Sequence, residues 1–339
     1  MSAKKTVLVT DYAWPTLDRE RAILEKIGAS LVVATTGSEE ELLRLAPSAY
    51  GILCNWKPVS RSVLEVAVRC IAVGRYGIGL DNIDVETATR LGIVVTNVPA
   101  YCVDDVADHA MALLLACNRK VGWFDHDVKT GRYDLQARAP LRRLRGQVLG
   151  LAGYGRIGQS VAQRARSFGL HVIALQPRRR TAPVANDGVE LVPLTELLER
   201  SDFLSLHLPA TPETKGMFDA AAFRRMKQGA VLINTARGTL VRTPDLLDAL
   251  ETGRIAAAGI DVWETEPLSP GDRLAAHPCV VATPHAAFYS DEAVAELQET
   301  AATQMAKLLS ELTSQNIVNP AVLDSPQLRL RRQPHDSEK

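Results

Sequence analysis

Short apolar runs alternate with amphipathic stretches along the N-terminal third of the chain. The apolar runs predict strands at 6–11, 30–35, 51–55, 70–74 and 93–98. Between them, apolar positions recur at helical spacing over 16–28, 38–46, 60–68 and 84–91. Strands that alternate with helices in this way predict right-handed crossover connections and a parallel sheet.

A second series of the same kind begins at residue 147. It predicts strands at 147–152, 171–175, 203–208, 230–235, 256–262 and 280–285. Between two of them, Thr243, Pro244 and Asp245 have the order of an N-cap, a first-position proline and a first-turn acid. Gly253 suits the exit from that helix. The sequence therefore predicts an α/β protein with two doubly wound domains.

Three segments lie outside the two series. We expect a long helix at 101–119 and a last helix at 290–312, whereas 120–147 is polar, rich in arginine and poorly periodic. A structureless loop of that length is unusual inside a compact domain, so we interpret 120–147 as an excursion that embraces a second subunit. The last helix is expected to return the chain to the first domain. The expected parts are one domain at 1–99 and 288–322, a second domain at 100–287, and a flexible tail at 323–339.

Composition and charge narrow the class of protein. Hydrophobic residues make up 46% and charged residues 23%, as in ordinary globular domains. Lys+Arg and Asp+Glu both number 39, and this balance argues against a direct nucleic-acid or polyanion partner. No apolar run approaches the length that spans a bilayer, and the N-terminus lacks a signal peptide's apolar core. We therefore expect a cytoplasmic protein without a membrane partner.

The cysteines indicate neither a metal site nor a disulfide framework. They number five, and their spacing is irregular. Cys54, Cys70, Cys117 and Cys279 lie in apolar strand-like or helical runs, so we interpret them as small core residues.

A glycine-rich turn follows the first strand of the second series. Gly153, Gly155 and Gly158 fit the pattern G-x-G-x-x-G, and the turn opens a predicted helix. The first glycine allows a tight turn, the second lets the backbone approach a pyrophosphate, and the third lets helix and strand pack closely. The N-terminus of the helix then faces the phosphates with open N–H groups. The alternative is a glycine-rich turn that binds nothing.

Three polar stretches begin at the ends of later strands in this series, at 234–241, 259–267 and 283–290. In open parallel sheets, ligands bind beyond the carboxyl ends of the strands. Arg237, Glu266 and His285 should therefore be delivered to the side where a dinucleotide would lie. Taken singly, each could equally be a surface arginine, a loop glutamate or a structural histidine.

Together these three side chains suit the reduction of a 2-oxo acid. An arginine can clamp a carboxylate with two hydrogen bonds and polarise the adjacent ketone. A histidine can donate a proton near neutral pH while a hydride arrives from a nicotinamide. A carboxylate beside the histidine favours its protonated form and fixes its orientation.

The chain resembles the D-isomer-specific 2-hydroxyacid dehydrogenases in motifs at 153–158, 234–238, 261–267 and 283–285, and also at 74–99. The resemblance covers nearly the whole chain. The ending TPHAAFYS at 283–290 is most similar to the branch that includes the C-terminal-binding-protein corepressors. The resemblance implies a Rossmann NAD(P)-binding domain, a flavodoxin-like substrate domain with the cleft between the two, and a homodimer with hinges near 99–101 and 286–290.

The resemblance also implies roles for single residues. Arg237 would hold the substrate carboxylate, His285 would be the acid and base, and Glu266 would be its partner. Residues near the substrate carboxylate would be Tyr76, Gly77 and Ile78, through their backbone. Residues implied to bind the cofactor are Tyr154, Gly155, Arg156, Ile157, Thr235, Ala236, Asp261 near the nicotinamide amide, and His207 and Pro209 beside the adenosine.

The stretch LQPRRR at 175–180 departs from the usual fingerprint. The end of the second strand usually carries an acid that binds the adenosine ribose, but this chain has Gln176 there. Arg178 and Arg179 could accommodate a 2′-phosphate, so we expect NADP(H) to be favoured, with NAD(H) possible. The alternative is a solvated basic turn in an NAD(H) enzyme.

The substrate tail and the biological role stay open. Lys57 and Arg75 follow two strand ends of the first domain and could contact an acidic or phosphorylated tail, or could be solvated and brace a loop. Trp56 could close over an apolar substrate or pack. The leading function is a nicotinamide-dependent 2-oxo acid reductase, and the alternative is a dinucleotide-sensing, corepressor-like binding protein with incidental dehydrogenase activity.

Overall fold

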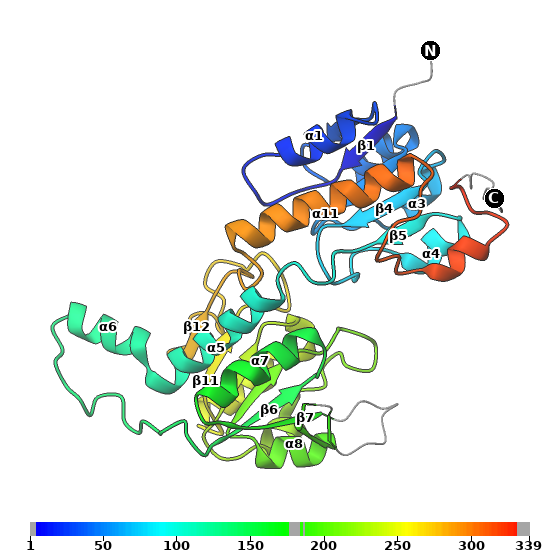
Figure 1. Ribbon diagram of the computed structural model, residues 1–339. Helices are drawn as coiled ribbons and strands as arrows, with labels where there is room; N and C mark the ends of the chain where they lie inside the picture. Colours follow the sequence, from blue (N-terminus) through cyan, green and yellow to red (C-terminus); the bar gives the residue numbers. More distant parts are fainter. Residues whose placement is uncertain (1–4, 176–183, 186, 331–339) are drawn as a thin grey trace. The chain divides into compact units, whose positions relative to one another are not determined.

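The computed structural model describes residues 5–175, 184–185 and 187–330. They divide into two compact units (Figure 1). The first unit joins the N-terminal part of the chain, up to Tyr101, to the C-terminal part from Ser290, and the second unit is Cys102–Tyr289. Each unit is an α/β domain built on its own parallel sheet, so the predicted fold class is confirmed.

Five strands form the sheet of the first unit among the described residues, in the order β2-β1-β3-β4-β5. They are β1 (Thr6–Val9), β2 (Ser30–Val33), β3 (Gly51–Cys54), β4 (Ala72–Arg75) and β5 (Val94–Thr96). Every neighbouring pair is parallel, with Leu8 opposite Ile52 in the central pair. This order is that of flavodoxin-like sheets. Strand β3 is buried throughout, as a parallel strand covered on both faces should be.

Helices cover both faces of this sheet. They are α1 (Asp18–Glu25), α2 (Glu39–Leu45), α3 (Arg61–Val66), α4 (Val85–Arg90) and α11 (Asp291–Leu309), with short 3-10 turns at Ala46–Ser48 and Pro320–Asp324. Helices α1 and α11 lie side by side (Figure 1). A Cβ at Gly51 would lie 2.4 Å from the sulfur of Met305, so this glycine lets α11 pack directly on the strand.

Seven strands form the sheet of the second unit within the described ranges, in the order β12-β11-β10-β9-β6-β7-β8. They are β6 (Val148–Ala152), β7 (His171–Leu175), β8 (Glu190–Val192), β9 (Phe203–Leu206), β10 (Ala230–Asn234), β11 (Ile255–Ile260) and β12 (Val280–Ala282). All neighbouring pairs are parallel. The strand order reverses between β6 and β9, and this switch point is where a doubly wound sheet binds its ligand.

Alternate residues of these strands enter two separate cores. Leu232 of β10 packs in a core with helices α8 (Leu194–Arg200), α9 (Ala220–Arg225) and α10 (Thr243–Glu251). Its neighbour Ile233 packs in the other core, with helices α5 (Val103–Arg119) and α7 (Arg156–Ser167). This alternation follows from the two-residue period of a strand. No helix of the described residues is long and apolar enough to cross a membrane.

Two elements were not predicted and one cap was predicted wrongly. Within 120–147, which was expected to be an excursion, the structure has the helix α6 (Val121–Lys129), which extends away from the sheet of its unit (Figure 1). Strand β8 was not predicted at all. Thr243 is not the N-cap of α10, since Arg242 holds that position and makes no side-chain cap bond. The expectation for Gly253 is confirmed, because it follows the C-cap Thr252 with a left-handed φ of 68°.

Candidate active site

Three neighbouring strands deliver the predicted catalytic residues. Strands β10, β11 and β12 are adjacent and parallel, so their carboxyl ends lie at one edge of the sheet. Asn234 pairs with Ile260, which in turn pairs with Ala282. The segments that carry Arg237, Glu266 and His285 therefore start from matched positions on three neighbouring strands.

Glu266 and His285 form a hydrogen-bonded pair. Nδ1 of His285 lies 2.7 Å from Oε2 of Glu266, and both side chains are half-buried. The other carboxylate oxygen, Oε1, accepts a 2.8 Å hydrogen bond from the backbone N–H of Trp263. Burial by itself would raise the pKa of Glu266, but the hydrogen bond and charge of His285, the Trp263 N–H and the charge of Arg237 outweigh it and lower the pKa. The structure thus favours an ionised carboxylate that orients the imidazole.

His285 is held in a left-handed backbone conformation, with φ of 56°. Its N–H donates to the backbone oxygen of Asp261 at 2.7 Å. The Asp261 carboxylate is fully buried and accepts hydrogen bonds from Thr283 Oγ1 at 2.6 Å, from Ala286 N at 2.8 Å and from Ala287 N at 3.0 Å. These bonds offset the cost of the left-handed residue, about 1–2 kcal/mol. The Asp261 side chain is therefore committed to the turn that presents His285.

Arg237 follows β10 in an ordered turn. The side chain of Asn234 spans this turn: Nδ2 donates to the backbone oxygen of Arg237 at 2.9 Å, and Oδ1 accepts from Ala236 N at 3.1 Å. The guanidinium of Arg237 donates to the backbone oxygen of Ala236 at 2.7 Å. Asn234 is buried, so it fixes where the arginine leaves the sheet.

Gly238 and Trp263 join these segments, and sequence reasoning missed both. A Cβ at Gly238 would lie 2.0 Å from the carbonyl carbon of Trp263, so only glycine lets the two backbones approach. The buried indole of Trp263 donates from Nε1 to the backbone oxygen of Thr283 at 3.1 Å. Trp263 thereby links the segments that follow β11 and β12. Its place inside the matched motif GIDVWETEP was the available signal.

The glycine-rich turn has the shape that a dinucleotide requires. Gly153 has a φ of 115°, and a Cβ there would lie 2.5 Å from the backbone oxygen of His207. A Cβ at Gly158 would lie 2.3 Å from the oxygen of Gly153. Gly155, the N-cap of α7, is different, because a Cβ there meets no atom of the described residues within 4 Å. The turn is thus closed behind and open in front of the helix N-terminus, which fits a pyrophosphate.

The side chains of this turn differ in what they contact. Ile157 and Tyr154 pack against the core of α5 and α7. The hydroxyl of Tyr154 donates to the carboxylate of Asp187, and burial with this bond raises the pKa of the tyrosine. Arg156 is exposed at the start of α7.

Residues after β9 and β10 complete the neighbourhood of the turn. The N–H of His207 donates to Ala152 at 2.8 Å, and its ring Nε2 lies 2.9 Å from Ser205 Oγ. Burial of this ring lowers its pKa to about 4. Pro209 is exposed. Thr235 is buried, and its hydroxyl has no partner within residues 5–175, 184–185 and 187–330, as expected of a donor kept for a ligand.

The predicted substrate residues other than Arg237 belong to the first unit. The Tyr76 ring is buried and its hydroxyl donates to Glu20 at 3.1 Å, while its backbone N–H donates to Cys54 at 2.8 Å and its backbone oxygen accepts from Arg75. Gly77 accepts from Val98 N at 3.0 Å, which fixes the loop. Arg75 donates to Asn55 Oδ1 at 3.2 Å.

Hydrogen bonds also fix the backbone at Ile78, Trp56 and Lys57 of the first unit. The backbone oxygen of Ile78 accepts from Asn97 at 2.8 Å. The backbone N–H groups of Trp56 and Lys57 donate to Asp11, at 2.7 and 3.2 Å. The ring of Trp56 is nevertheless 47% exposed, so it can meet a ligand.

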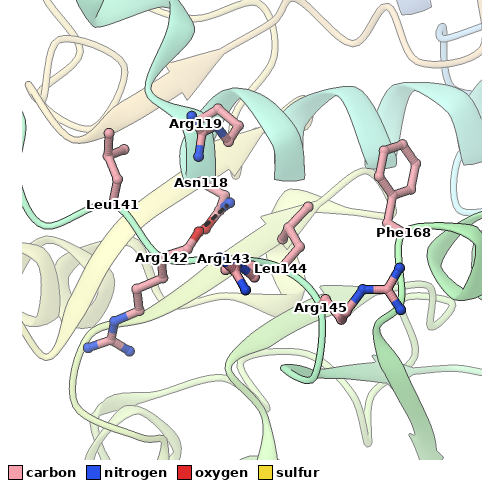
Figure 2. Close-up of a pocket in the computed structure, with 8 residues that line it drawn as sticks. All are labelled: Asn118, Arg119, Leu141, Arg142, Arg143, Leu144, Arg145 and Phe168. Carbon is pink, nitrogen blue, oxygen red and sulfur yellow. Dashed lines mark hydrogen bonds between the residues drawn. The ribbon is translucent and has the colours of Figure 1, made fainter.

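A hollow at the C-terminal end of α5 contains none of the predicted site residues. Figure 2 shows its lining, where Asn118 Nδ2 donates to the backbone oxygen of Arg142 at 3.2 Å. The guanidinium groups of Arg142 and Arg145 point away from each other. This hollow is a basic surface without a converging set of side chains. The predicted cofactor residues Gln176, Arg178 and Arg179 lie outside the described residues.

Comparisons with known proteins agree with this geometry. The model of the D-isomer specific 2-hydroxyacid dehydrogenase NAD binding domain matches residues 111–287. The glyoxylate reductase of Korarchaeum cryptofilum is 42% identical over 270 residues, which cover 78% of this chain and 81% of that protein. The D-3-phosphoglycerate dehydrogenase of Archaeoglobus fulgidus is 36% identical over 297 residues, 87% of this chain but only 56% of that longer protein.

A solved structure shows the same architecture. It is an NADPH-dependent glyoxylate/hydroxypyruvate reductase from Sinorhizobium meliloti, in complex with NADP and malonate. The two chains are 28% identical, with a TM-score of 0.82 over 98% of this chain and 99% of that one. The chain therefore belongs to the D-isomer specific 2-hydroxyacid dehydrogenase family of oxidoreductases.

Proposed function

We propose that this protein reduces a 2-oxo acid to the D-2-hydroxy acid, with His285 as proton donor and Arg237 as the residue that binds the substrate carboxylate. The observation that carries the proposal is the 2.7 Å bond between Nδ1 of His285 and Glu266, at the sheet edge that also presents Arg237. A relative named glyoxylate reductase supports the same class of substrate.

The hydrogen bond between Glu266 and His285 determines which ring nitrogen of His285 donates the proton to the substrate. Because Glu266 is an ionised acceptor, Nδ1 of His285 carries a hydrogen and stays bound to the carboxylate. The proton that reaches the substrate therefore leaves from Nε2. Glu266 stabilises the imidazolium before this transfer and holds the ring in place during it.

Arg237 would bind the substrate carboxylate through two parallel N–H groups and would polarise the neighbouring ketone. The backbone of the Tyr76–Ile78 loop is assigned to the same carboxylate on the resemblance alone. Arg75 and Lys57 are the residues of the first unit that would contact a longer or more acidic substrate tail; the alternative is that Lys57 is solvated and that Arg75, which donates to Asn55 Oδ1 at 3.2 Å, braces its loop.

A nicotinamide dinucleotide held at Gly155 would supply the hydride. Tyr154, Arg156 and Ile157 would frame its pyrophosphate, and the residues assigned around its two ends are His207, Pro209, Thr235, Ala236 and Asp261. The open face of Gly155 and the Thr235 hydroxyl, which has no partner among the residues that the structure describes, support this assignment.

We further propose a preference for NADP(H), based on Gln176 in place of an acid and on Arg178 and Arg179 beside it. The matched domain model is described as NAD binding, whereas the Sinorhizobium enzyme is NADPH-dependent. The ratio of kcat/KM for NADPH to that for NADH tests the preference. A clear advantage for NADH would contradict it.

The reaction is tested by mixing the purified protein with NADPH or NADH and a panel of 2-oxo acids. The panel includes glyoxylate, hydroxypyruvate, phenylpyruvate and phosphorylated acids, and the loss of absorbance of the reduced nicotinamide is followed. We expect turnover with at least one acid. Binding of the dinucleotide without turnover of any acid would favour the corepressor-like sensor, to which the ending TPHAAFYS is similar.

A further inference from the structure

A second histidine contacts the turn that presents His285, the candidate proton donor. His109 projects from α5, and its side chain is 25% exposed. Its Nε2 lies 3.0 Å from Oγ1 of Thr283 and 3.6 Å from Oδ1 of Asp261. Thr283 and Asp261 both belong to the turn that presents His285.

The packing of α5 on β11 explains why His109 reaches this turn. A Cβ at Gly259 would lie 2.8 Å from Cβ of Leu113, so the missing side chain lets the helix pack directly on the strand. Asp261 is two residues further along the strand and faces the same side. His109 is one helical turn before Leu113 on the same helix face. One helical turn of about 5.4 Å and two strand residues of about 6.6 Å cover similar distances, so the two side chains meet.

The two hydrogen bonds of the Thr283 hydroxyl determine which ring nitrogen of His109 carries a hydrogen. The Thr283 hydroxyl has one hydrogen, and it donates this hydrogen to Asp261 at 2.6 Å. The same oxygen can therefore only accept from His109, whose Nε2 must carry a hydrogen. His109 is thus a donor to Thr283, and Thr283 is a donor to Asp261.

Asp261 in turn forms hydrogen bonds that hold the backbone around His285. Its carboxylate accepts from the N–H groups of Ala286 and Ala287, directly after His285. Its backbone oxygen accepts from the N–H of His285. A rotation of the Asp261 side chain would release the backbone on the C-terminal side of a residue that is already in a left-handed conformation.

We propose that His109 is a positioning residue for the reaction: by donating to Thr283 it locks Asp261, and so it fixes the place from which His285 delivers its proton. The inference rests on the proposed role of His285. It makes helix α5 part of the catalytic support, although His109 touches none of the reacting groups.

The kinetic test uses His109→Leu, which keeps the bulk of the ring and removes the donor, and His109→Gln, whose amide N–H has a similar reach. We expect His109→Leu to lower kcat about ten- to a hundredfold, since small misplacements of a reacting group have effects of this size. KM for the 2-oxo acid should stay within about twofold, since Arg237 is not part of this chain of hydrogen bonds. His109→Gln should recover most of kcat.

His171→Leu is the matched control, because His171 is exposed at the start of β7, at the opposite end of the strands. It should leave kcat unchanged. Wild-type activity that is abolished by His285→Ala establishes the proposed function separately. If wild type shows no activity, the proposed function fails; if wild type is active and His109→Leu keeps its kcat, only the His109 inference is overturned. Equal losses in the Leu and Gln variants would also overturn it, since they indicate a packing role alone.

Two further measurements keep the inference testable if His109→Leu folds poorly. In a double-mutant cycle, His109→Ala, which removes the donor, and Thr283→Val should not be additive in kcat, because both act through one chain of hydrogen bonds. Additive effects would contradict the inference. In the unliganded wild-type protein, nitrogen NMR of the histidines should show a hydrogen on Nε2 of His109. A ring protonated only on Nδ1 would overturn the chain of donors.

Discussion

Several residues in this site act by fixing the positions of neighbouring residues. Gly238 contributes no side chain, yet it allows the Arg237 segment to lie against the backbone of Trp263. Trp263 then uses its N–H for Glu266 and its indole for Thr283. The geometry of the candidate site therefore depends on residues that are assigned no contact with the substrate.

Gly238→Ala tests this dependence. The added Cβ would lie 2.0 Å from the Trp263 carbonyl carbon, so backbone has to move. We expect a loss of about 1–3 kcal/mol in the free energy of unfolding and a Tm lower by roughly 2–12 °C. Turnover should fall as well. Gly122→Ala, where a Cβ meets nothing within 4 Å, is the control and should not lower Tm. A Gly238→Ala protein with wild-type Tm and turnover would show that the close approach is unimportant.

His207 predicts a pH dependence of stability. Burial lowers its pKa to about 4 from an ordinary value of 6.5. Between these pH values the unfolded chain binds a proton that the folded protein does not, so stability is lost as the pH falls through this window. We expect His207→Gln, which does not titrate, to lose less Tm than wild type on going from neutral pH to about pH 4. Parallel Tm curves for the two proteins would contradict the lowered pKa.

At the scale of elements, the turn between β6 and α7 contains two glycines with different roles. Gly158 allows close packing, whereas Gly155 leaves the front of the turn open. Gly158→Ala places a Cβ 2.3 Å from the Gly153 oxygen and should lower Tm. The methyl group of Gly155→Ala meets no described residue within 4 Å, so the variant should fold normally, but this methyl group occupies the open face of the turn. We expect it to weaken binding of the dinucleotide at least about tenfold, or 1.4 kcal/mol. Thermal unfolding measures the Tm of Gly158→Ala, and fluorescence titration measures the affinity of Gly155→Ala for the dinucleotide. Wild-type affinity in Gly155→Ala would contradict the assignment of the pyrophosphate site.

The apolar pattern predicted most strands because buried parallel strands are nearly continuous apolar runs. It missed β8 because ELV at Glu190–Val192 is short and begins with an exposed glutamate. It missed α6 because this helix starts at a left-handed Lys120, directly after α5, and is held by Trp123, whose indole donates to Pro278 at 2.6 Å. A contact so distant in sequence leaves no periodic signal.

The same limit applies to the site. Arg237, Glu266 and His285 could be predicted because each follows a strand end in a recognisable motif. The donor from His109 to Thr283 spans 174 residues, and no local pattern indicates it. The role of Asp261 depends on the buried bonds that it accepts, which only the folded backbone reveals.

At the scale of the whole molecule, the segment around α6 leaves large apolar side chains in solvent. Tyr133 is 97% exposed and Leu135 is 84% exposed. The segment is nevertheless ordered by Arg138, which binds both carboxylate oxygens of Asp127, at 2.6 and 2.7 Å. An ordered segment with exposed apolar tips suits an interface, and we propose that it forms the homodimer predicted from the sequence.

Replacing both Tyr133 and Leu135 with serine should shift the protein from dimer to monomer. Each buried side chain of this size contributes about 1.5–3 kcal/mol to association. Sedimentation velocity measures the change, and Val68→Ser, at an exposed apolar residue of the first unit, is the control. A wild-type monomer, or a double variant that stays dimeric, would contradict this interface.

The turnover of His285→Ala with the best 2-oxo acid of the panel tests the proposed mechanism most directly. We expect kcat to fall by about 10²–10⁴, the usual contribution of a positioned acid. The dissociation constant of the dinucleotide should stay within about twofold, since His285 is placed with Glu266 and not in the glycine-rich turn. Turnover close to that of wild type would remove His285 from its role and, with it, the proposed mechanism.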